Sequence, residues 1–165
     1  MNKKTRFMVH GALIGALYVV LTYAQNFLLP GTTSNAIQFR VSEALCVLAL
    51  FTPAAIPGLT IGCLLFNISN GAIPLDFIIG SAASLLAAWG MWQTRKVTLH
   101  GYPLFAMLLP AVLNGLLVGW ELSYLMGGGF WINAAYVAIG EAAVLLTVGS
   151  VVYFAMKKHA NRIFG

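Results

Sequence analysis

Four acidic residues stand out in this chain because all of them lie within or at the ends of apolar segments. Inside a bilayer, a charged side chain costs several kcal/mol unless it faces a cavity or a partner. Glu141 is ten residues into its apolar segment, which corresponds to about 15 Å along a helix and so to the middle of a membrane. We therefore interpret Glu141 as a contact for a ligand or ion. The alternative is a structural carboxyl that is protonated or paired with a buried hydroxyl or amide.

The other three acidic residues leave more than one interpretation open. Glu121, near the outer end of a predicted helix, is either a ligand contact or an acid that reaches interfacial water. Asp76 follows Pro74 and suits the first turn of a helix, where a negative charge complements the helix dipole. Glu43 is three residues after Arg40, so the two can pair along one helix face. That pair is either a plain salt bridge or part of a binding site.

Amide and aromatic side chains accompany the acidic residues in the outer half of the predicted helices. Asn114 is seven residues before Glu121 and therefore shares its helix face. The remaining candidates are Asn67, Asn70, Gln38, Trp120, Tyr124, Trp131, Asn133 and Tyr136. An aromatic belt at the membrane interface is the alternative for Trp120, Tyr124 and Trp131. Together these groups predict an outward-facing pocket for a small planar ligand that is rich in hydrogen-bond donors and can be cationic.

The composition places these residues in a membrane protein. Hydrophobic residues make up 60% of the 165 residues and charged residues 8%, against about 25% charged residues in soluble domains. A chain so poor in charge cannot cover its own surface in water, which excludes a soluble enzyme, a disordered tail and a coiled coil. We therefore predict an all-α integral membrane protein that forms a single membrane domain over residues 1–165.

Six transmembrane helices are predicted, with the N- and C-termini cytoplasmic. Their approximate ranges are 7–29, 41–51, 55–68, 75–92, 103–123 and 131–156. The apolar block over 41–68 is interrupted by Pro53 and Pro57, so it is either one kinked span or a hairpin of two short helices. A hairpin places eight basic residues inside and one outside, whereas a single span places three inside and six outside. Because basic residues favour the cytoplasmic side, we expect the hairpin.

Sequence motifs of catalysis and of metal binding are not found. The chain has no Walker lysine loop, HExxH or GxSxG, and no pairing of a nucleophile with a base is evident. Cys46 and Cys63 lie in apolar segments, and we interpret them as small buried hydrophobic residues rather than metal ligands. The expectation is a protein that is not an enzyme and that needs no cofactor.

The predicted first helix carries a cluster of small residues at Gly11, Ala12, Gly15 and Ala16. Small residues four apart allow another helix to approach closely. The approaching helix belongs either to the same bundle or to a second membrane protein. The spacing alone does not separate these two possibilities.

Three segments between residues 37 and 62 are distinctive. They read Ile37-Gln38-Phe39-Arg40-Val41-Ser42-Glu43-Ala44-Leu45, Phe51-Thr52-Pro53 and Gly58-Leu59-Thr60-Ile61-Gly62. With these segments, a six-helix architecture and an outer polar pocket, the chain resembles the substrate-binding S components of energy-coupling factor (ECF) transporters. Within that group the segments are similar to the queuosine-precursor subgroup, usually called QueT. The likeness extends over nearly the whole chain.

The resemblance implies a ligand and partners. S components bind a vitamin or similar micronutrient from outside a prokaryotic cell and pair, in the plasma membrane, with a transmembrane coupling subunit and two cytoplasmic ATPases. The family's Ala-xxx-Ala docking motif matches Ala12 and Ala16, and we expect Gly11 and Gly15 to belong to the same docking face. For the QueT subgroup, the ligand would be a 7-deazaguanine such as preQ0, preQ1, queuine or queuosine.

A 7-deazaguanine would use the predicted pocket residues in distinct ways. Glu141 or Glu121 would accept hydrogen bonds from the guanine-like edge, the other would meet a ligand amine, and Trp131 or Tyr136 would stack on the base. The supporting polar residues would be Asn67, Asn70, Asn114, Asn133, Arg40 and Glu43. Two alternatives are an S component for another heterocyclic vitamin and a standalone proton-coupled carrier that uses Glu141.

Overall fold

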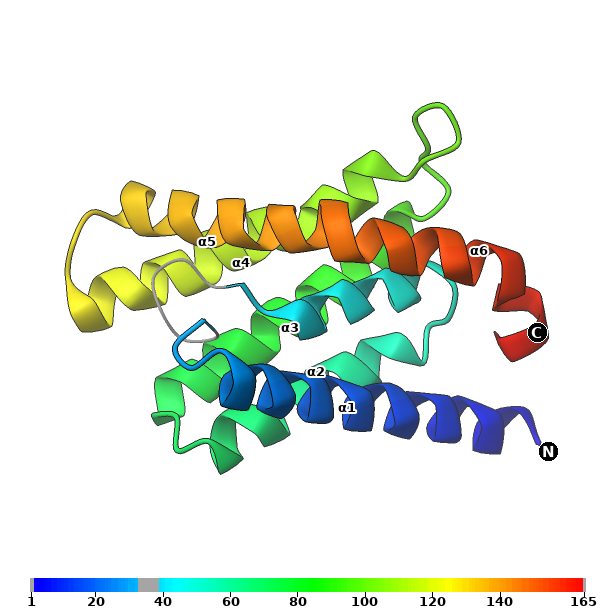
Figure 1. Ribbon diagram of the computed structural model, residues 1–165, viewed down its shortest axis with the longest axis horizontal. Helices are drawn as coiled ribbons and strands as arrows, with labels where there is room; N and C mark the ends of the chain where they lie inside the picture. Colours follow the sequence, from blue (N-terminus) through cyan, green and yellow to red (C-terminus); the bar gives the residue numbers. More distant parts are fainter. Residues whose placement is uncertain (1, 33–38, 165) are drawn as a thin grey trace.

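The computed structural model of the protein describes residues 2–32 and 39–164, and this part of the chain is a bundle of helices without a named strand (Figure 1). Ile37 and Gln38 of the distinctive segments lie outside the described residues. In chain order the elements are α1 (Lys3–Leu28), η1 (Val41–Leu50), α2 (Ala55–Ser69), α3 (Pro74–Thr94), α4 (Leu104–Met126), α5 (Phe130–Val144), η2 (Leu145–Gly149) and α6 (Ser150–Phe164). The prediction of an all-α fold is confirmed for these residues.

Within the described residues, four helices are long and apolar enough to cross a membrane. They are α1, α3, α4 and the continuous helix Phe130–Ala160, in which α5 runs through the short π-helix η2 into α6. The two remaining helices, η1 with 10 residues and α2 with 15, are shorter than the roughly 20 residues that a helix needs to span the hydrocarbon core. The protein is therefore a multi-pass membrane protein with two additional short apolar helices.

Glycines bring neighbouring helices into backbone contact. A Cβ atom added to Gly58 on α2 would lie 2.6 Å from the carbonyl oxygen of Gly11 on α1. A Cβ added to Gly119 on α4 would lie 2.5 Å from the Cα atom of Ala134 on α5. Side chains at these glycines would force the helices apart. In lipid, the hydrophobic effect does not drive helices together, because lipid tails are as apolar as the side chains. Helices associate there by close van der Waals packing, which small residues allow.

The short helix η1 lies in the middle of the bundle, where it packs against α1, α3 and η2 (Figure 1). Nearly all of its residues are buried. It is a 3-10 helix with three residues per turn, so side chains three apart in sequence are eclipsed on one edge. Arg40, Glu43 and Cys46 follow this spacing, and the Cys46 thiol donates a hydrogen bond to Glu43 Oε2 at 3.2 Å.

Hydrogen bonds tie the beginning of η1 to α1. The Tyr18 hydroxyl donates to Glu43 Oε1 at 2.5 Å, and the Thr22 hydroxyl donates to Ser42 Oγ at 2.8 Å. One turn further along α1, Gln25 Oε1 accepts the Val41 backbone N–H at 2.7 Å. Because Tyr18, Thr22 and Ser42 are fully buried, these bonds fix the depth and rotation of η1 and with them the position of Glu43.

Candidate functional site

The neighbouring helices α3 and α4 each turn one face that carries polar residues toward the same space. On α4 this face consists of Asn114, Val118 and Glu121, spaced by four and three residues, which is the spacing of a single helix face. On α3 the face has a spacing of four residues and consists of Asp76, Gly80 and Ser84.

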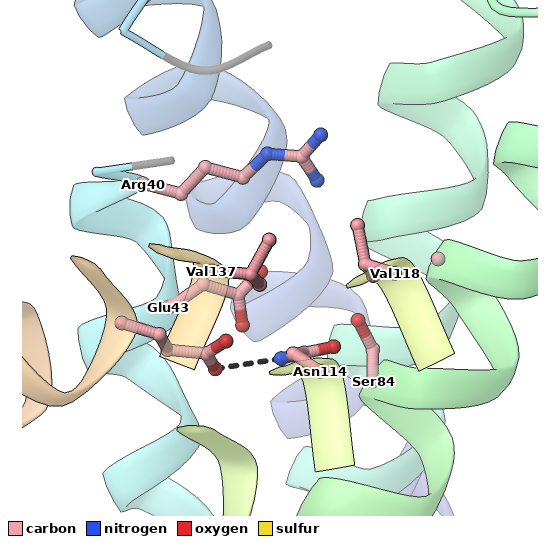
Figure 2. A pocket seen from close by; sticks show the side chains of 8 residues that line it. Arg40, Glu43, Ser84, Asn114, Val118 and Val137 are labelled. Carbon is pink, nitrogen blue, oxygen red and sulfur yellow. Dashed lines mark hydrogen bonds between the residues drawn. The ribbon is translucent and has the colours of Figure 1, made fainter. Parts of the chain in front are cut away.

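The inner part of this space is a small polar cavity, which we call the inner chamber. It has a volume of about 20 Å³, room for roughly one water molecule, and Glu43 and Glu141 both line it. The Asn114 side-chain amide donates to Glu141 Oε1 at 2.6 Å, so that Oε2 and one lone pair of Oε1 remain for a ligand. Figure 2 shows Glu43, Asn114 and Ser84 around this space, with the guanidinium of Arg40 extending over it.

Glu43 is held more tightly than Glu141. Its two carboxylate oxygens accept hydrogen bonds from the Tyr18 hydroxyl and the Cys46 thiol, and its side chain is buried. A buried carboxylate is stable only when it is hydrogen-bonded or paired. The donors Tyr18 and Cys46 therefore explain why the Glu43 side chain on η1 can be buried in the core. The result is a second carboxylate in the inner chamber with a fixed orientation.

A larger cavity, which we call the outer cleft, adjoins the inner chamber, and we call the two together the joined cavity. It has a volume of about 560 Å³, and Arg40, Gly80 and Val118 line both cavities. A volume of this size falls within the range of pockets that hold small organic molecules, roughly 300–1,000 Å³. Asn67 and Asn70 from the end of α2 also line the outer cleft.

All four acidic residues of the chain line the joined cavity. Glu43 and Glu141 line the inner chamber, and Asp76 and Glu121 line the outer cleft. The structure describes all nine lysines and arginines, and of these only Arg40 lines either cavity. With every group ionised, the joined cavity would therefore carry a formal charge of −3. Such a surplus favours a ligand that donates hydrogen bonds or carries a positive charge.

Glu121 differs from the other acids in having a buried carboxylate oxygen without a hydrogen-bond donor among the described residues. Its side chain is only 3% exposed, and Oε1 is buried without a hydrogen-bond partner among the described residues. A buried acceptor without a donor costs about 1–3 kcal/mol. The position therefore suits a donor supplied by a bound molecule.

Most of the predicted binding residues come together in this cavity. Those that line it are Glu141, Glu121, Asn114, Asn67, Asn70, Arg40 and Glu43. Trp131, Asn133 and Tyr136 line neither part. Trp131 is 75% exposed, and the Asn133 amide donates to Ser123 Oγ at 3.0 Å instead. Tyr136 is also exposed, next to the inward-facing Val137. The rotation of α5 places these three residues outside the cavity walls, and the sequence alone does not give that rotation.

Other lining residues were not singled out in the sequence as binding residues. Asp76 was interpreted as a helix-capping acid, although it also lies in the wall of the outer cleft. Gly80 and Ser84 follow Asp76 at intervals of four residues, and this spacing could have placed all three on one helix face from the sequence alone. The aromatic side chain in the wall of the outer cleft is Phe66, which is buried at the end of α2.

The small residues of α1 differ in burial although they line the same groove. Gly11 and Gly15 are buried against α2. Ala12 and Ala16 are exposed, and all four small residues line an apolar groove along α1 and α2, with a volume of about 620 Å³. The glycines therefore pack the bundle, whereas the alanines remain accessible.

Comparison with known proteins identifies the family. A family model described as QueT transporter matches residues 8–158, which is most of the chain. The chain belongs to the QueT transporter family. The predicted resemblance to queuosine-precursor transporters is thereby confirmed.

A curated relative points the same way. The queuosine precursor transporter QueT of Lactococcus lactis subsp. cremoris (strain MG1363) is 37% identical over 85 residues, which cover 52% of this chain and 48% of the relative. The chain thus matches about half the length of that protein. No solved structure matches the chain.

Proposed function

We propose that this QueT-family protein is the substrate-binding S component of an ECF importer and captures a 7-deazaguanine, such as preQ0, preQ1, queuine or queuosine, from outside a prokaryotic cell. The observation that carries the proposal is the convergence of all four carboxylates on one cavity within a transporter of this family. A 7-deazaguanine presents N1–H and the 2-amino group side by side, and a carboxylate can accept both in a bidentate, charge-assisted contact.

Glu141 is the carboxylate best placed to accept hydrogen bonds from N1–H and the 2-amino group. Asn114 donates to Oε1 and thereby orients the group, while Oε2 and a second lone pair of Oε1 can accept the two donors of the ligand. The inner chamber admits only the edge of a base, because its volume is about that of one water molecule. The two rings would lie in the outer cleft beside Phe66, and Arg40, which lines both cavities, could donate to the carbonyl oxygen of the base.

The direction of capture follows from the proposed topology, in which six helices cross or enter the membrane with both termini cytoplasmic. Figure 1 shows the N- and C-termini at one end of the bundle and the α4–α5 connection at the other. Asn70, Gly71 and Met126 line the outer cleft at this opposite end. The outer cleft would therefore open to the outside.

Coupling to the partner subunits is assigned to the apolar groove along α1 and α2. Ala12 and Ala16 are exposed there, on a helix whose glycines already serve packing within the bundle. Short alanine side chains let a helix of the transmembrane coupling subunit approach closely, and ATP hydrolysis would occur in the two associated ATPases. An energy source outside this chain fits the lack of an ATP-binding motif in the sequence.

The test compares uptake of labelled preQ1 by cells with binding by the purified protein. Ala12→Leu together with Ala16→Leu should abolish uptake and leave binding unchanged, because leucines fill the groove far from the cavity. Ala135→Leu with Ala155→Leu is the matched control, since both alanines are exposed on other helices. Normal uptake by the groove variant would contradict docking at this surface.

The proton-coupled carrier is the competing function, and the buried carboxylate Glu141 is the observation that favours it. The two mechanisms differ in their source of energy. Uptake that stops with a protonophore while ATP is held constant would support the carrier. Uptake that persists under the protonophore and stops on ATP depletion would support the ECF importer.

A further inference from the structure

The outer cleft contains a carboxylate that the protein itself does not satisfy. Glu121 is nine-tenths or more buried, lines the outer cleft and has an oxygen, Oε1, without a hydrogen-bond partner among the described residues. This differs from the inner chamber, where Glu43 accepts from Tyr18 and Cys46 and Glu141 accepts from Asn114. Oε1 of Glu121 therefore lacks a donor among the described residues.

A second acid stands beside Glu121. The Asp76 carboxyl, in the first turn of α3, lines the same cleft and interacts electrostatically with the Glu121 carboxyl. Two carboxylates in the same cleft repel each other unless a cation lies between them. Arg40 is the one basic residue of the chain that lines the cavity, and it faces the acids of the inner chamber as well. A further positive charge from a ligand would relieve the repulsion.

The spacing along α4 gives the distance between this acidic pair and Asn114, which together with Glu141 is proposed to bind the guanine-like edge. Glu121 is seven residues after Asn114 on the same face, which is about 10 Å along the helix at 1.5 Å per residue. With the guanine-like edge of a base at Glu141 and Asn114, the opposite end of the two-ring system would point toward Glu121. The substituent at position 7 of a 7-deazaguanine is on that opposite end.

We propose that Asp76 and Glu121 form a cation subsite that binds a protonated amine on the ligand, so that the protein prefers amine-bearing 7-deazaguanines to neutral ones. This rests on the proposed function and specifies its ligand. A charge-assisted hydrogen bond to a carboxylate is worth more than a neutral one, and its loss corresponds to about a tenfold or larger change in affinity.

The experiment titrates the detergent-purified, full-length protein with two probes. One is 7-aminomethyl-7-deazaguanine, which carries a primary amine, and the other is 7-methyl-7-deazaguanine, which is neutral and of similar shape. Wild-type protein should bind the amine at least about tenfold more tightly. Glu121→Gln and Asp76→Asn should each reduce this ratio and retain affinity for the neutral probe. Glu141→Gln should weaken both probes and keep the ratio.

The outcomes separate the subsite from the proposed function. A ratio near one in wild-type protein, or an unchanged ratio in both isosteric variants, would overturn the cation subsite while leaving base binding in place. Absence of binding to either probe would instead contradict the proposed function. Asp76 is partly exposed at a helix start, so Asp76→Asn keeps the test decisive even if the buried Glu121 variant does not fold. Asn133→Ala, outside both cavities, is the control that should preserve both affinities.

Discussion

Replacing Glu141 with Gln is the perturbation that addresses the inner chamber most directly. In the structure, the Asn114 amide donates to Glu141 Oε1 at 2.6 Å. A glutamine can keep this bond only by turning its carbonyl oxygen toward Asn114, which turns its own amide NH2 toward the ligand. The N1–H and 2-amino donors of a 7-deazaguanine would then face another donor instead of a carboxylate oxygen.

The magnitude follows from the lost hydrogen bonds. Each hydrogen bond to a charged group contributes about 1.5–3 kcal/mol, so loss of one of the two predicts weakening of at least about 1.5 kcal/mol, or more than tenfold in Kd. Thermal unfolding of the unliganded protein should be unchanged or shifted upward. The substitution removes a buried charge while Asn114 retains an acceptor, and buried charges carry a large desolvation cost.

Isothermal titration and thermal unfolding of the same preparations measure both effects. The expected pattern is weaker binding of 7-deazaguanines without loss of thermal stability. Wild-type affinity in Glu141→Gln would remove Glu141 from the site and refute the reasoning. Equal losses of binding and stability would show instead that the residue acts through folding.

Three further substitutions test the rest of the account. Gly80→Leu should weaken binding strongly in the same titration, because a Cβ at Gly80 would already lie 3.0 Å from Asn67 Nδ2 and the larger side chain would displace this amide from the wall of the outer cleft; Gly80→Ala, which adds a single methyl group, should have a smaller effect, and equal affinity in both variants would contradict the role of Asn67. Trp131→Ala should leave Kd unchanged, because Trp131 is 75% exposed and lines neither cavity, and a large loss would restore it as the stacking residue. Tyr18→Phe should lower the unfolding temperature by removing a donor worth about 1.5–3 kcal/mol to Glu43; an unchanged melting curve would contradict that role.

Composition and hydropathy were sufficient to predict an all-α membrane protein. The break between η1 and α2 falls where Pro53 predicted it, and there Thr52 Oγ1 accepts the Ala54 backbone N–H at 3.3 Å. Placing Asn114 and Glu121 on one face of a helix was equally accessible, since a spacing of seven residues fixes it. Both side chains line the joined cavity.

Helix rotation and backbone geometry were not accessible in the same way. The rotation of α5 turns Val137 inward and leaves the adjacent Tyr136 exposed, but apolar residues surround both in the sequence. The 3-10 geometry of η1 depends on tertiary hydrogen bonds such as that from Tyr18 to Glu43, between residues far apart in the chain. Local sequence patterns do not contain this information.

Titration of the purified wild-type protein with preQ1, with guanine and thiamine as controls, tests the central claim most directly. The account predicts tight one-to-one binding of the deazaguanine without ATP or partner subunits, and much weaker binding of thiamine, which lacks the guanine-like edge. Absence of preQ1 binding, or equal binding of all three compounds, would contradict the assignment of the joined cavity as a 7-deazaguanine site.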